Sequence, residues 1–252
     1  MLKGIVRKLV AGNWKMNGLM ADGVARARDL AARAKAKPLA CEIVLCPPAT
    51  LLVPVAQAIA GSGLGLGGQD CHAAAAGPHT GDIGAPMLKD AGCTYVILGH
   101  SERRQDHKES DAIVRAKAVA AVAAGLCAIV CVGETAAERA SGRTEATVVR
   151  QLQNSLPPKV GAAALVVAYE PVWAIGSGRT PTAQDVGSVH ARIRETLRDL
   201  AADAAAMRIL YGGSVKAANA HDLAAVANVD GFLVGGASLN ADEFWSIAAA
   251  CG

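Results

Sequence analysis

The stretch Leu165-Val-Val-Ala-Tyr-Glu-Pro-Val-Trp-Ala-Ile-Gly-Ser-Gly178 joins an apolar run to a single carboxylate and a loop that contains glycines. The five residues from Leu165 to Tyr169 predict a strand that is buried on both faces, as the strands of parallel sheets are. Glu170 follows directly and therefore stands at the carboxyl end of that strand, where a carboxylate can take part in proton transfer. Pro171 fixes its own φ and the glycines free the backbone further on, so the loop is predicted to be a flap that closes over a substrate.

Similar apolar runs recur along the whole chain. Eight of them are predicted strands, at residues 8–11, 43–46, 64–67, 95–98, 126–132, 165–169, 209–211 and 231–234. Between them lie segments of helical period, of which the clearest has apolar residues at Val186, Val189, Ile193, Leu197 and Leu200. Eight such units in 252 residues average about 31 residues each, enough for a parallel crossover with its helix. Because closing eight strands leaves no sheet edge, we expect a single α/β domain over residues 1–252, a (β/α)8 barrel; an open doubly wound sheet is the alternative.

Composition and charge narrow the classes of partner. The chain carries 25 Lys and Arg against 22 Asp and Glu, a formal charge of +3, and only 3% aromatic residues. This balance argues against nucleic acid and membrane surfaces as partners and favours a small soluble ligand. The longest uncharged stretch, residues 118–133, falls short of the roughly 20 residues that a membrane span requires. The apolar runs near the start are too short for a secretion signal.

The seven cysteines bear on two questions: the cellular compartment of the protein and whether it holds a zinc ion. Four of them lie in or beside strand-like apolar runs, where free thiols pack well: Cys41, Cys46, Cys127 and Cys131. The odd number and these positions predict a reducing cytoplasm, and the spacings match no zinc site. Cys131 adjoins no basic partner, so a packed thiol is favoured over a nucleophile. Five histidines are scattered without ligand spacing, which predicts surface or capping roles for His72, His79, His107, His190 and His221.

The active groups of such a barrel lie just after its strands, at the C-terminal rim. Asn13 and Lys15 follow the first strand two residues apart, hence on one side of an extended chain; Lys15 is either a cation for an anionic substrate or a solvated side chain. His100 follows the fourth strand at a turn, with Ser101 and Glu102 as caps that open a helix. The positive helix end predicts a lowered pKa, which keeps His100 neutral and able to donate a hydrogen bond to a substrate oxygen; a structural loop histidine is the alternative.

Two pairs of glycines follow the last two strands. Tyr211-Gly-Gly-Ser-Val215 and Gly235-Gly-Ala-Ser-Leu239 each continue with helix-compatible residues. Paired glycines let backbone N–H groups approach a ligand, and a helix N-terminus beside them favours phosphate. At adjacent strands of one barrel they predict a phosphate site. The glycine-rich segment 61–68 lacks the G-x-G-x-x-G spacing and the strand-to-helix context, which argues against a dinucleotide site.

Together these motifs resemble one family, triosephosphate isomerase, over nearly the whole chain. The resemblance rests on Val10-Ala-Gly-Asn-Trp-Lys-Met-Asn17, Gly99-His-Ser-Glu-Arg-Arg104, Ala168-Tyr-Glu-Pro-Val-Trp-Ala-Ile-Gly176, Tyr211-Gly-Gly-Ser-Val215 and Val234-Gly-Gly-Ala-Ser-Leu239. It implies a (β/α)8 TIM barrel that interconverts dihydroxyacetone phosphate and D-glyceraldehyde 3-phosphate through an enediolate, in glycolysis and gluconeogenesis, with no metal and no organic cofactor. The alternatives are another sugar-phosphate enzyme of this fold and a noncatalytic binding protein on the same scaffold.

The resemblance also implies roles for particular residues. Glu170 matches the base, His100 the neutral electrophile and Lys15 the cation that holds the substrate. Asn13 matches a further donor, and Glu102 matches a residue that supports this group. The residues that match phosphate ligands are Gly176, Ser214, Gly235 and Gly236, and those that match partners of the closed flap are Tyr211 and Ser214. The flap itself comprises Pro171, Val172, Trp173, Ala174, Ile175, Gly176, Ser177 and Gly178.

The family is usually dimeric, through a loop after the third strand that inserts beside the partner's active site. Here that loop is residues 69–85, and Thr80-Gly81-Asp82 resembles its tip. The resemblance therefore implies a homodimer in which Thr80 approaches Asn13 and Lys15 of the partner subunit.

Two departures from the family's pattern concern this interface and the flap. Asp82 stands where glutamate is common, and its shorter arm leaves open a pairing with Arg103 of the partner subunit. Arg179 and Pro181 stand where lysine and alanine are frequent. Because Pro181 fixes its own φ and restricts Thr180, we expect a stiffer hinge and altered closing kinetics.

Overall fold

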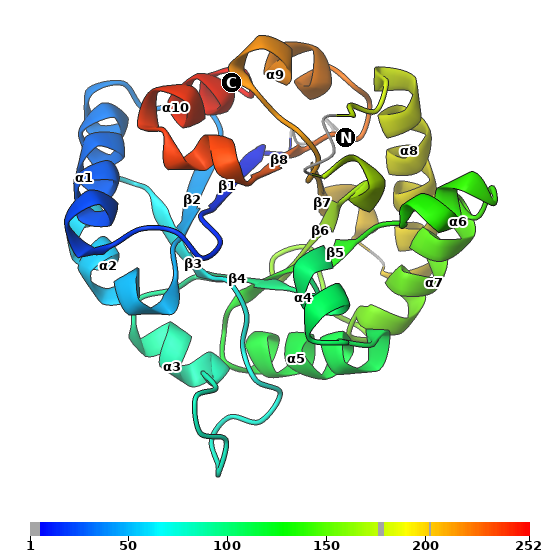
Figure 1. Ribbon diagram of the computed structural model, residues 1–252, viewed down its shortest axis with the longest axis horizontal. Helices are drawn as coiled ribbons and strands as arrows, with labels where there is room; N and C mark the ends of the chain where they lie inside the picture. Colours follow the sequence, from blue (N-terminus) through cyan, green and yellow to red (C-terminus); the bar gives the residue numbers. More distant parts are fainter. Residues whose placement is uncertain (1–5, 176–178, 202) are drawn as a thin grey trace.

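A computed structural model describes residues 6–175, 179–201 and 203–252. Its centre is a closed barrel of parallel strands in chain order, in which β8 pairs with β1. The strands are Leu9–Asn13 (β1), Glu42–Cys46 (β2), Gly65–Gly68 (β3), Tyr95–Leu98 (β4), Cys127–Val132 (β5), Leu165–Tyr169 (β6), Arg208–Tyr211 (β7) and Gly231–Val234 (β8). Figure 1 shows these strands inside a ring of helices. The predicted fold is confirmed, and each strand boundary lies within about two residues of its prediction.

Helices follow the strands and cover the barrel. They are α1 (Met20–Ala36), α2 (Leu52–Ile59), α3 (Ala85–Asp90), α4 (Ser101–Asp106), α5 (Asp111–Ala123), α6 (Ala136–Ala140), α7 (Thr144–Ser155), α8 (Ala183–Leu200), α9 (Ala217–Ala224) and α10 (Ala241–Ala249). Four short 3-10 turns add η1 (Ala49–Leu51), η2 (Val172–Ala174), η3 (Ala204–Ala206) and η4 (Gly236–Leu239). The stripe predicted for α8 faces the core except at its end, where Leu200 is 37% exposed. Among the described residues, no helix combines the length and apolar character that a membrane span needs.

Alternation along the strands explains both the apolar runs and the place of the polar groups. In β6, Val166 and Ala168 belong to the core inside the barrel, whereas Val167 packs in the core between barrel and helices. Because successive side chains point to opposite faces, Glu170 continues the inward series just beyond the end of β6. Asn13 ends β1 in the same way. The strand period therefore aims both side chains at the mouth of the barrel.

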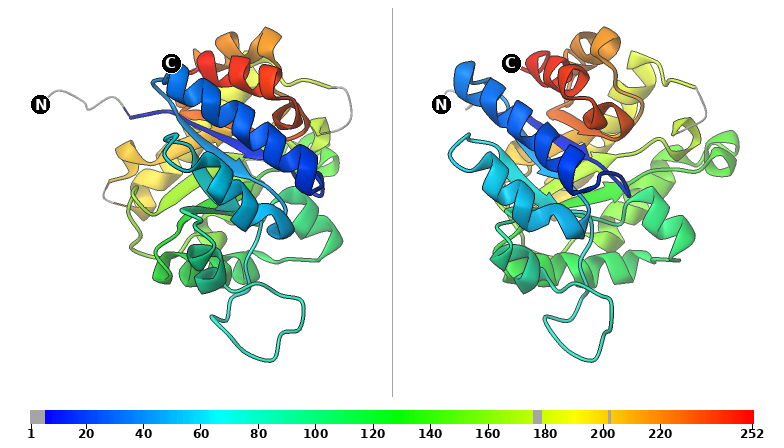
Figure 2. Two further views of the ribbon diagram at one scale, coloured as in Figure 1. Left: turned by 90° about the vertical axis from the view of Figure 1, so that its left-hand side faces the viewer. Right: turned by 60° about the vertical axis from the view of Figure 1, so that its left-hand side comes forward.

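The segment between β3 and α3 leaves the body of the barrel as a long loop. Figure 1 and Figure 2 show it standing out beyond the ring of helices. At its base, His72 and Gly84 form an isolated parallel bridge. Near its tip, Gly81 has φ +93°, a left-handed conformation that glycine adopts without strain. This segment is the one that the family resemblance singled out.

Candidate active site

A cavity of about 420 Å³ opens at the C-terminal rim of the barrel. Its walls come from the ends of β1, β4, β6, β7 and β8 and the segments that follow them. They include eight of the predicted site residues: Asn13, Lys15, His100, Glu170, Ile175, Ser214, Gly235 and Gly236. Segments far apart in the chain thus meet at one mouth, as the rim rule of this fold predicts.

Glu170 is a buried carboxylate with three donors around it. Its side chain is 2% exposed. One oxygen, Oε2, accepts from the backbone N–H of Ser101 at 3.0 Å, while Oε1 lies 2.9 Å from Nε2 of His100 and accepts from Oγ of Ser101 at 3.4 Å. Burial pushes the pKa of Glu170 up, but His100 and the Ser101 N–H outweigh it, so the pKa lies below its ordinary value. The group is therefore held ionised, as a base has to be.

His100 is the N-cap of α4 and the partner of Glu170. Its Nδ1 accepts from the backbone N–H of Glu102 at 3.2 Å, so in the neutral ring the proton sits on Nε2, which faces Glu170. Burial lowers the pKa of His100, but the Glu170 carboxylate raises it more, and the pKa lies above its ordinary value. The predicted lowering is therefore wrong for this arrangement. A full carboxylate charge at 2.9 Å outweighs the partial charge of the helix end.

Lys15 also lines the cavity, and its backbone is in a left-handed conformation, with φ +53°. Its N–H donates to Oδ1 of Asn13 at 3.0 Å, and Gln69 donates to its carbonyl oxygen at 2.8 Å. Its Nζ lies 2.6 Å from Oε1 of Glu102. These contacts fix the loop after β1, and they bring Glu102 into the group that the resemblance proposed.

Close packing requires the two glycines after β7 but not the two after β8. A Cβ at Gly212 would lie 2.9 Å from Cγ of Glu170, and one at Gly213 would overlap the hydroxyl group of Tyr211. A Cβ at Gly235 would lie 3.4 Å from Cε of Lys15. Gly236 has open space around it and begins η4. At Gly212 and Gly213 the backbone can therefore come close to Glu170 and Tyr211 only because these two residues lack side chains.

The first half of the predicted flap is anchored to the barrel. Residues Val172–Ala174 form η2, and Ile175 lines the cavity. Nε1 of Trp173 donates to Oε1 of Glu134 at 2.8 Å, and the Arg139 guanidinium stacks on the Trp173 ring at 4.2 Å. The remaining flap residues of the prediction, Gly176, Ser177 and Gly178, lie outside the described residues.

Two contacts of this site were missed by sequence reasoning. Ser101 had been assigned only a capping role, yet it donates twice to Glu170. Glu134 had not been singled out; its fully buried carboxylate accepts from Trp173 and from Tyr169 at 3.1 and 3.2 Å. Glu134 follows β5 by two residues, so the same rim rule that singled out Glu170 could have identified it.

Other predicted residues occupy places apart from the cavity. Tyr211 is fully buried, and within the described part of the chain its hydroxyl group has no hydrogen-bond partner. Thr80, Gly81 and Asp82 lie on the projecting loop and are exposed. Cys131 is fully buried, and burial followed by the nearby Glu170 carboxylate raises the pKa of its thiol well above the ordinary value, in keeping with a packed thiol.

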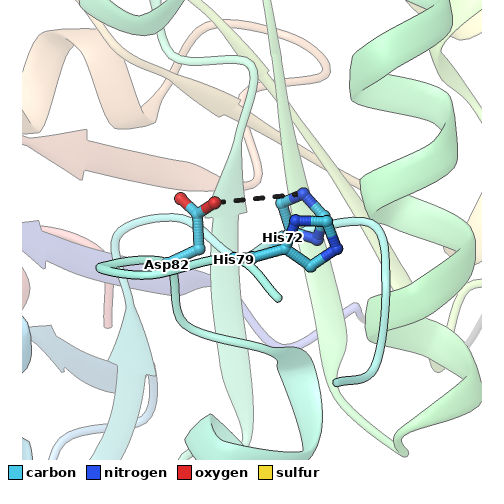
Figure 3. A group of neighbouring side chains, drawn as sticks. All are labelled: His72, His79 and Asp82. Carbon is cyan, nitrogen blue, oxygen red and sulfur yellow. Dashed lines mark ion pairs between the residues drawn. The ribbon is translucent and has the colours of Figure 1, made fainter. Parts of the chain in front are cut away.

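The histidines are not all scattered. The structure brings His72 and His79 together with Asp82 on the projecting loop, in a group whose ligand atoms lie within 4.8 Å of one another (Figure 3). His72 and His79 are therefore close in space. The prediction of surface or capping roles agrees with the exposed His79, but it is wrong for His190, which is fully buried in α8. The loop folds back on itself between residues 72 and 82, and spacing along the sequence did not reveal that return.

A model of the triosephosphate isomerase family matches residues 8–251. The chain belongs to this family. The triosephosphate isomerase of Afipia carboxidovorans is 57% identical over 99% of this chain and 100% of its own length. That of Bradyrhizobium diazoefficiens is 55% identical over 98% of both chains.

A solved structure agrees with the fold. The crystal structure of triosephosphate isomerase from Bartonella henselae superposes with a TM-score of 0.90 at 46% identity, over 97% of this chain and 99% of that one. The resemblance to the triosephosphate isomerase family, the barrel and the prediction of an isomerase are confirmed.

Proposed function

We propose how this chain catalyses the reaction of its family, the interconversion of dihydroxyacetone phosphate and D-glyceraldehyde 3-phosphate. Glu170 is the base: it takes a proton from one carbon of the bound triose phosphate and returns it to the neighbouring carbon, through an enediolate. The observation that carries this role is an ionised carboxylate, 2% exposed, on the wall of the rim cavity. Burial without water makes a carboxylate a stronger base once its hydrogen bonds are given up.

His100 is the electrophile. Its Nδ1 is occupied by the N–H of Glu102, so Nε2 carries the one proton of the neutral ring and can donate it to a substrate oxygen. For this, Glu170 has to turn from His100 toward the substrate carbon. That movement also removes the carboxylate that raises the pKa of His100, and the imidazole then stays neutral during the reaction.

Lys15, Asn13 and the glycines hold the substrate. Lys15 supplies a positive charge at the mouth of the cavity, beside Asn13 and close to Gly235. The backbone N–H groups of Gly235 and Gly236, with Ser214, bind the phosphate, and Gly176 completes that set when the flap closes. Tyr211 and Ser214 hold the closed flap. The buried hydroxyl group of Tyr211 has no partner among the described residues and is a donor available for that contact.

We further propose that the protein is a homodimer. The projecting loop carries Thr80, Gly81 and Asp82, and Thr80 reaches Asn13 and Lys15 of the partner subunit. Large apolar side chains lie exposed after β1 and in α3, at Met16 (95%), Leu19 (80%), Met20 (58%) and Met87 (56%), and an interface would cover them. Within one chain Arg103 already pairs with Asp70 at 3.0 Å and with Glu109 at 2.8 Å, so its pairing with Asp82 of a partner would be an additional contact. A monodisperse, active monomer in sedimentation velocity would contradict the dimer.

We also propose a single domain over residues 1–252 and a cytoplasmic location. The family match from residue 8 to residue 251 supports the first. All seven cysteines are free, buried thiols, which supports a reducing compartment.

The experiment that tests the site is a coupled assay for glyceraldehyde 3-phosphate formation on the protein and on its Glu170→Asp variant. Aspartate keeps the charge but withdraws the carboxylate by about 1 Å, a displacement that costs on the order of a hundredfold in rate. Near-normal turnover in Glu170→Asp would remove Glu170 from the role of base.

A further inference from the structure

Two charged residues on the wall of the rim cavity belong neither to the catalytic candidates nor to the phosphate-binding residues proposed above: Lys216 and Glu243. Lys216 comes two residues after Ser214 and is the N-cap residue of α9, and Glu243 lies in the first turn of α10. Ser214 and Gly236, which line the same cavity, are two of the proposed phosphate ligands. Lys216 therefore adds a cation to the wall that also carries the phosphate site.

The side chain of Asn219 fixes Lys216 relative to Ser214. The backbone N–H of Lys216 donates to Oδ1 of Asn219 at 2.8 Å, and Nδ2 of the same side chain donates to the carbonyl oxygen of Ser214 at 3.2 Å. Lys216 is exposed, and it forms no ion pair with any residue that the structure describes. Its ammonium group is therefore available to an anion that enters the cavity.

Lysine is an unfavourable residue at this position of a helix. The preferred N-cap residues are Ser, Thr, Asp and Asn, whose side chains accept from free backbone N–H groups, and a cation at a helix N-terminus opposes the helix dipole. The side chain of Lys216 makes no capping hydrogen bond. A residue that breaks a local rule and is exposed rather than packed indicates a functional reason for its presence.

The balance of charge on the cavity wall shows what that reason is. Two carboxylates, Glu170 and Glu243, line the cavity beside Lys15 and Lys216, and Nζ of Lys15 lies 2.6 Å from Oε1 of Glu102. A phosphate group carries roughly 1.5 to 2 negative charges at pH 7. Of the two lining lysines, Lys216 is the one without a carboxylate partner among the described residues, so its charge acts on an approaching phosphate group with the least opposition.

We propose that Lys216 attracts the phosphate group of the substrate to the cavity and contributes to its binding, and thereby favours phosphorylated over uncharged trioses. This inference rests on the proposed function, because it assigns a further residue to the phosphate end of the same substrate. The phosphate group does not react, so Lys216 stabilises bound substrate and transition state alike, and KM should respond to it while kcat should not. Because Lys216 is exposed, salt should screen the attraction.

The test compares Lys216→Gln with the unaltered protein in the coupled assay at ionic strengths of about 0.01 M and 1 M, between which the Debye length falls from about 30 Å to about 3 Å. At low ionic strength we expect KM to rise roughly two- to fivefold, the size of an exposed ion pair, with kcat unchanged. At high ionic strength the two proteins should have the same KM. The inhibition constant of inorganic phosphate should follow KM, since this probe carries the charge without the triose carbons.

Three further variants separate a local charge from the net charge of the protein. Lys35→Gln removes an exposed cation from the last turn of α1, away from the cavity, and should leave KM unchanged. Glu243→Gln removes a lining carboxylate, so KM should fall at low ionic strength. Lys216→Arg keeps the positive charge and should keep the KM of the unaltered protein.

A measurement of stability distinguishes this role from a structural one. Serine suits the N-cap of α9 better than lysine, so Lys216→Ser should unfold in urea at the same or a higher midpoint while its KM rises as in Lys216→Gln. A lower midpoint together with a lower kcat would show that Lys216 serves the fold, and would overturn the proposal.

Two kinetic results would also overturn it: a KM of Lys216→Gln equal to that of Lys35→Gln at low ionic strength, or a rise in KM that is the same at both ionic strengths. Failure of the proposed function would look different, because the unaltered protein would then show no turnover. The affinity for inorganic phosphate, measured by calorimetry, would still decide the role of Lys216: a loss in Lys216→Gln at low ionic strength would support it, and an unchanged affinity would contradict it.

Discussion

Two buried histidines of this barrel differ in the way that we expect of a reactive group and a structural one. His100 is 6% exposed, touches the carboxylate of Glu170 at 2.9 Å and lines the rim cavity. His190 in α8 is fully buried; its Nδ1 lies 2.9 Å from the carbonyl oxygen of Asn228, and its ring packs edge-on to Tyr169 at 5.9 Å. Burial lowers the pKa of His190 to about 4, whereas the pKa of His100 is raised.

Burial alone therefore does not make a site. At His190, desolvation acts without a charged partner of opposite sign, and the ring stays neutral and fixed in the core. At His100, the same desolvation is opposed by the carboxylate of Glu170, which is itself buried and lines the rim cavity. Each group of the His100–Glu170 pair changes the proton affinity of the other, and a substrate in the cavity can separate them. The coupling of two titratable groups to a cavity is the feature that predicts chemistry.

The largest effect is expected when the carboxylate of this pair is removed. Glu170→Gln keeps the size of the side chain and its hydrogen bond with Ser101 but cannot take a proton, so turnover should fall by roughly 10²–10⁴-fold. The coupled assay measures the loss, and circular dichroism checks that the variant is folded. Activity within a few-fold of the unaltered protein would contradict the assignment of Glu170 as the base.

Removing the imidazole should have the next largest effect. His100→Gln deletes a donor aimed at developing charge, which costs roughly 10²–10³-fold in kcat. It also removes the main influence that lowers the pKa of Glu170, so that pKa should rise. Because only the ionised base is active, the acidic limb of kcat/KM should move to higher pH. An unshifted limb would mean that the two groups are not coupled.

His190 should instead control stability. Its folded-state pKa of about 4 lies below the ordinary 6.5, so the unfolded chain takes up a proton first as pH falls. Stability from this group is complete above pH 6.5 and is lost between 6.5 and 4, by about 3 kcal/mol in all. Urea unfolding of His190→Asn should depend less steeply on pH across this window than that of the unaltered protein, with exposed His221→Asn as control. Equal slopes would contradict the assignment.

The smallest change in stability is expected at Tyr211. Its hydroxyl group is buried without a partner in the described part of the chain, so Tyr211→Phe should alter the free energy of unfolding by less than about 1 kcal/mol. If that group holds the closed flap, kcat/KM falls nonetheless, by about tenfold. Unchanged kinetics would remove Tyr211 from the flap.

The sequence was sufficient for the barrel because each strand is apolar on both faces and each rim group follows a strand directly. Glu170, Lys15 and Asn13 were found in this way. Ser101 as a donor to Glu170 was not, since that contact joins positions 69 residues apart. The raised pKa of His100 was missed for the same reason: its cause is a neighbour in space, whereas the helix end that favoured the opposite direction is a neighbour in sequence.

The loop after β3 shows the same limit. The family resemblance singled out this loop, but the approach of His79 and Asp82 to His72 depends on how the loop returns on itself. Spacing rules for metal ligands describe regular helices and tight turns, and they do not cover a loop of this length. Contacts made by folding back across an irregular segment are those that sequence patterns leave undetermined.

The measurement that tests the central claim most directly is a double-mutant cycle on kcat/KM with Glu170→Gln, His100→Gln and the two combined. If base and electrophile act on one substrate in one step, the combined variant should lose little more activity than Glu170→Gln alone. Losses that multiply across the two sites would show that Glu170 and His100 act independently, and would contradict the account.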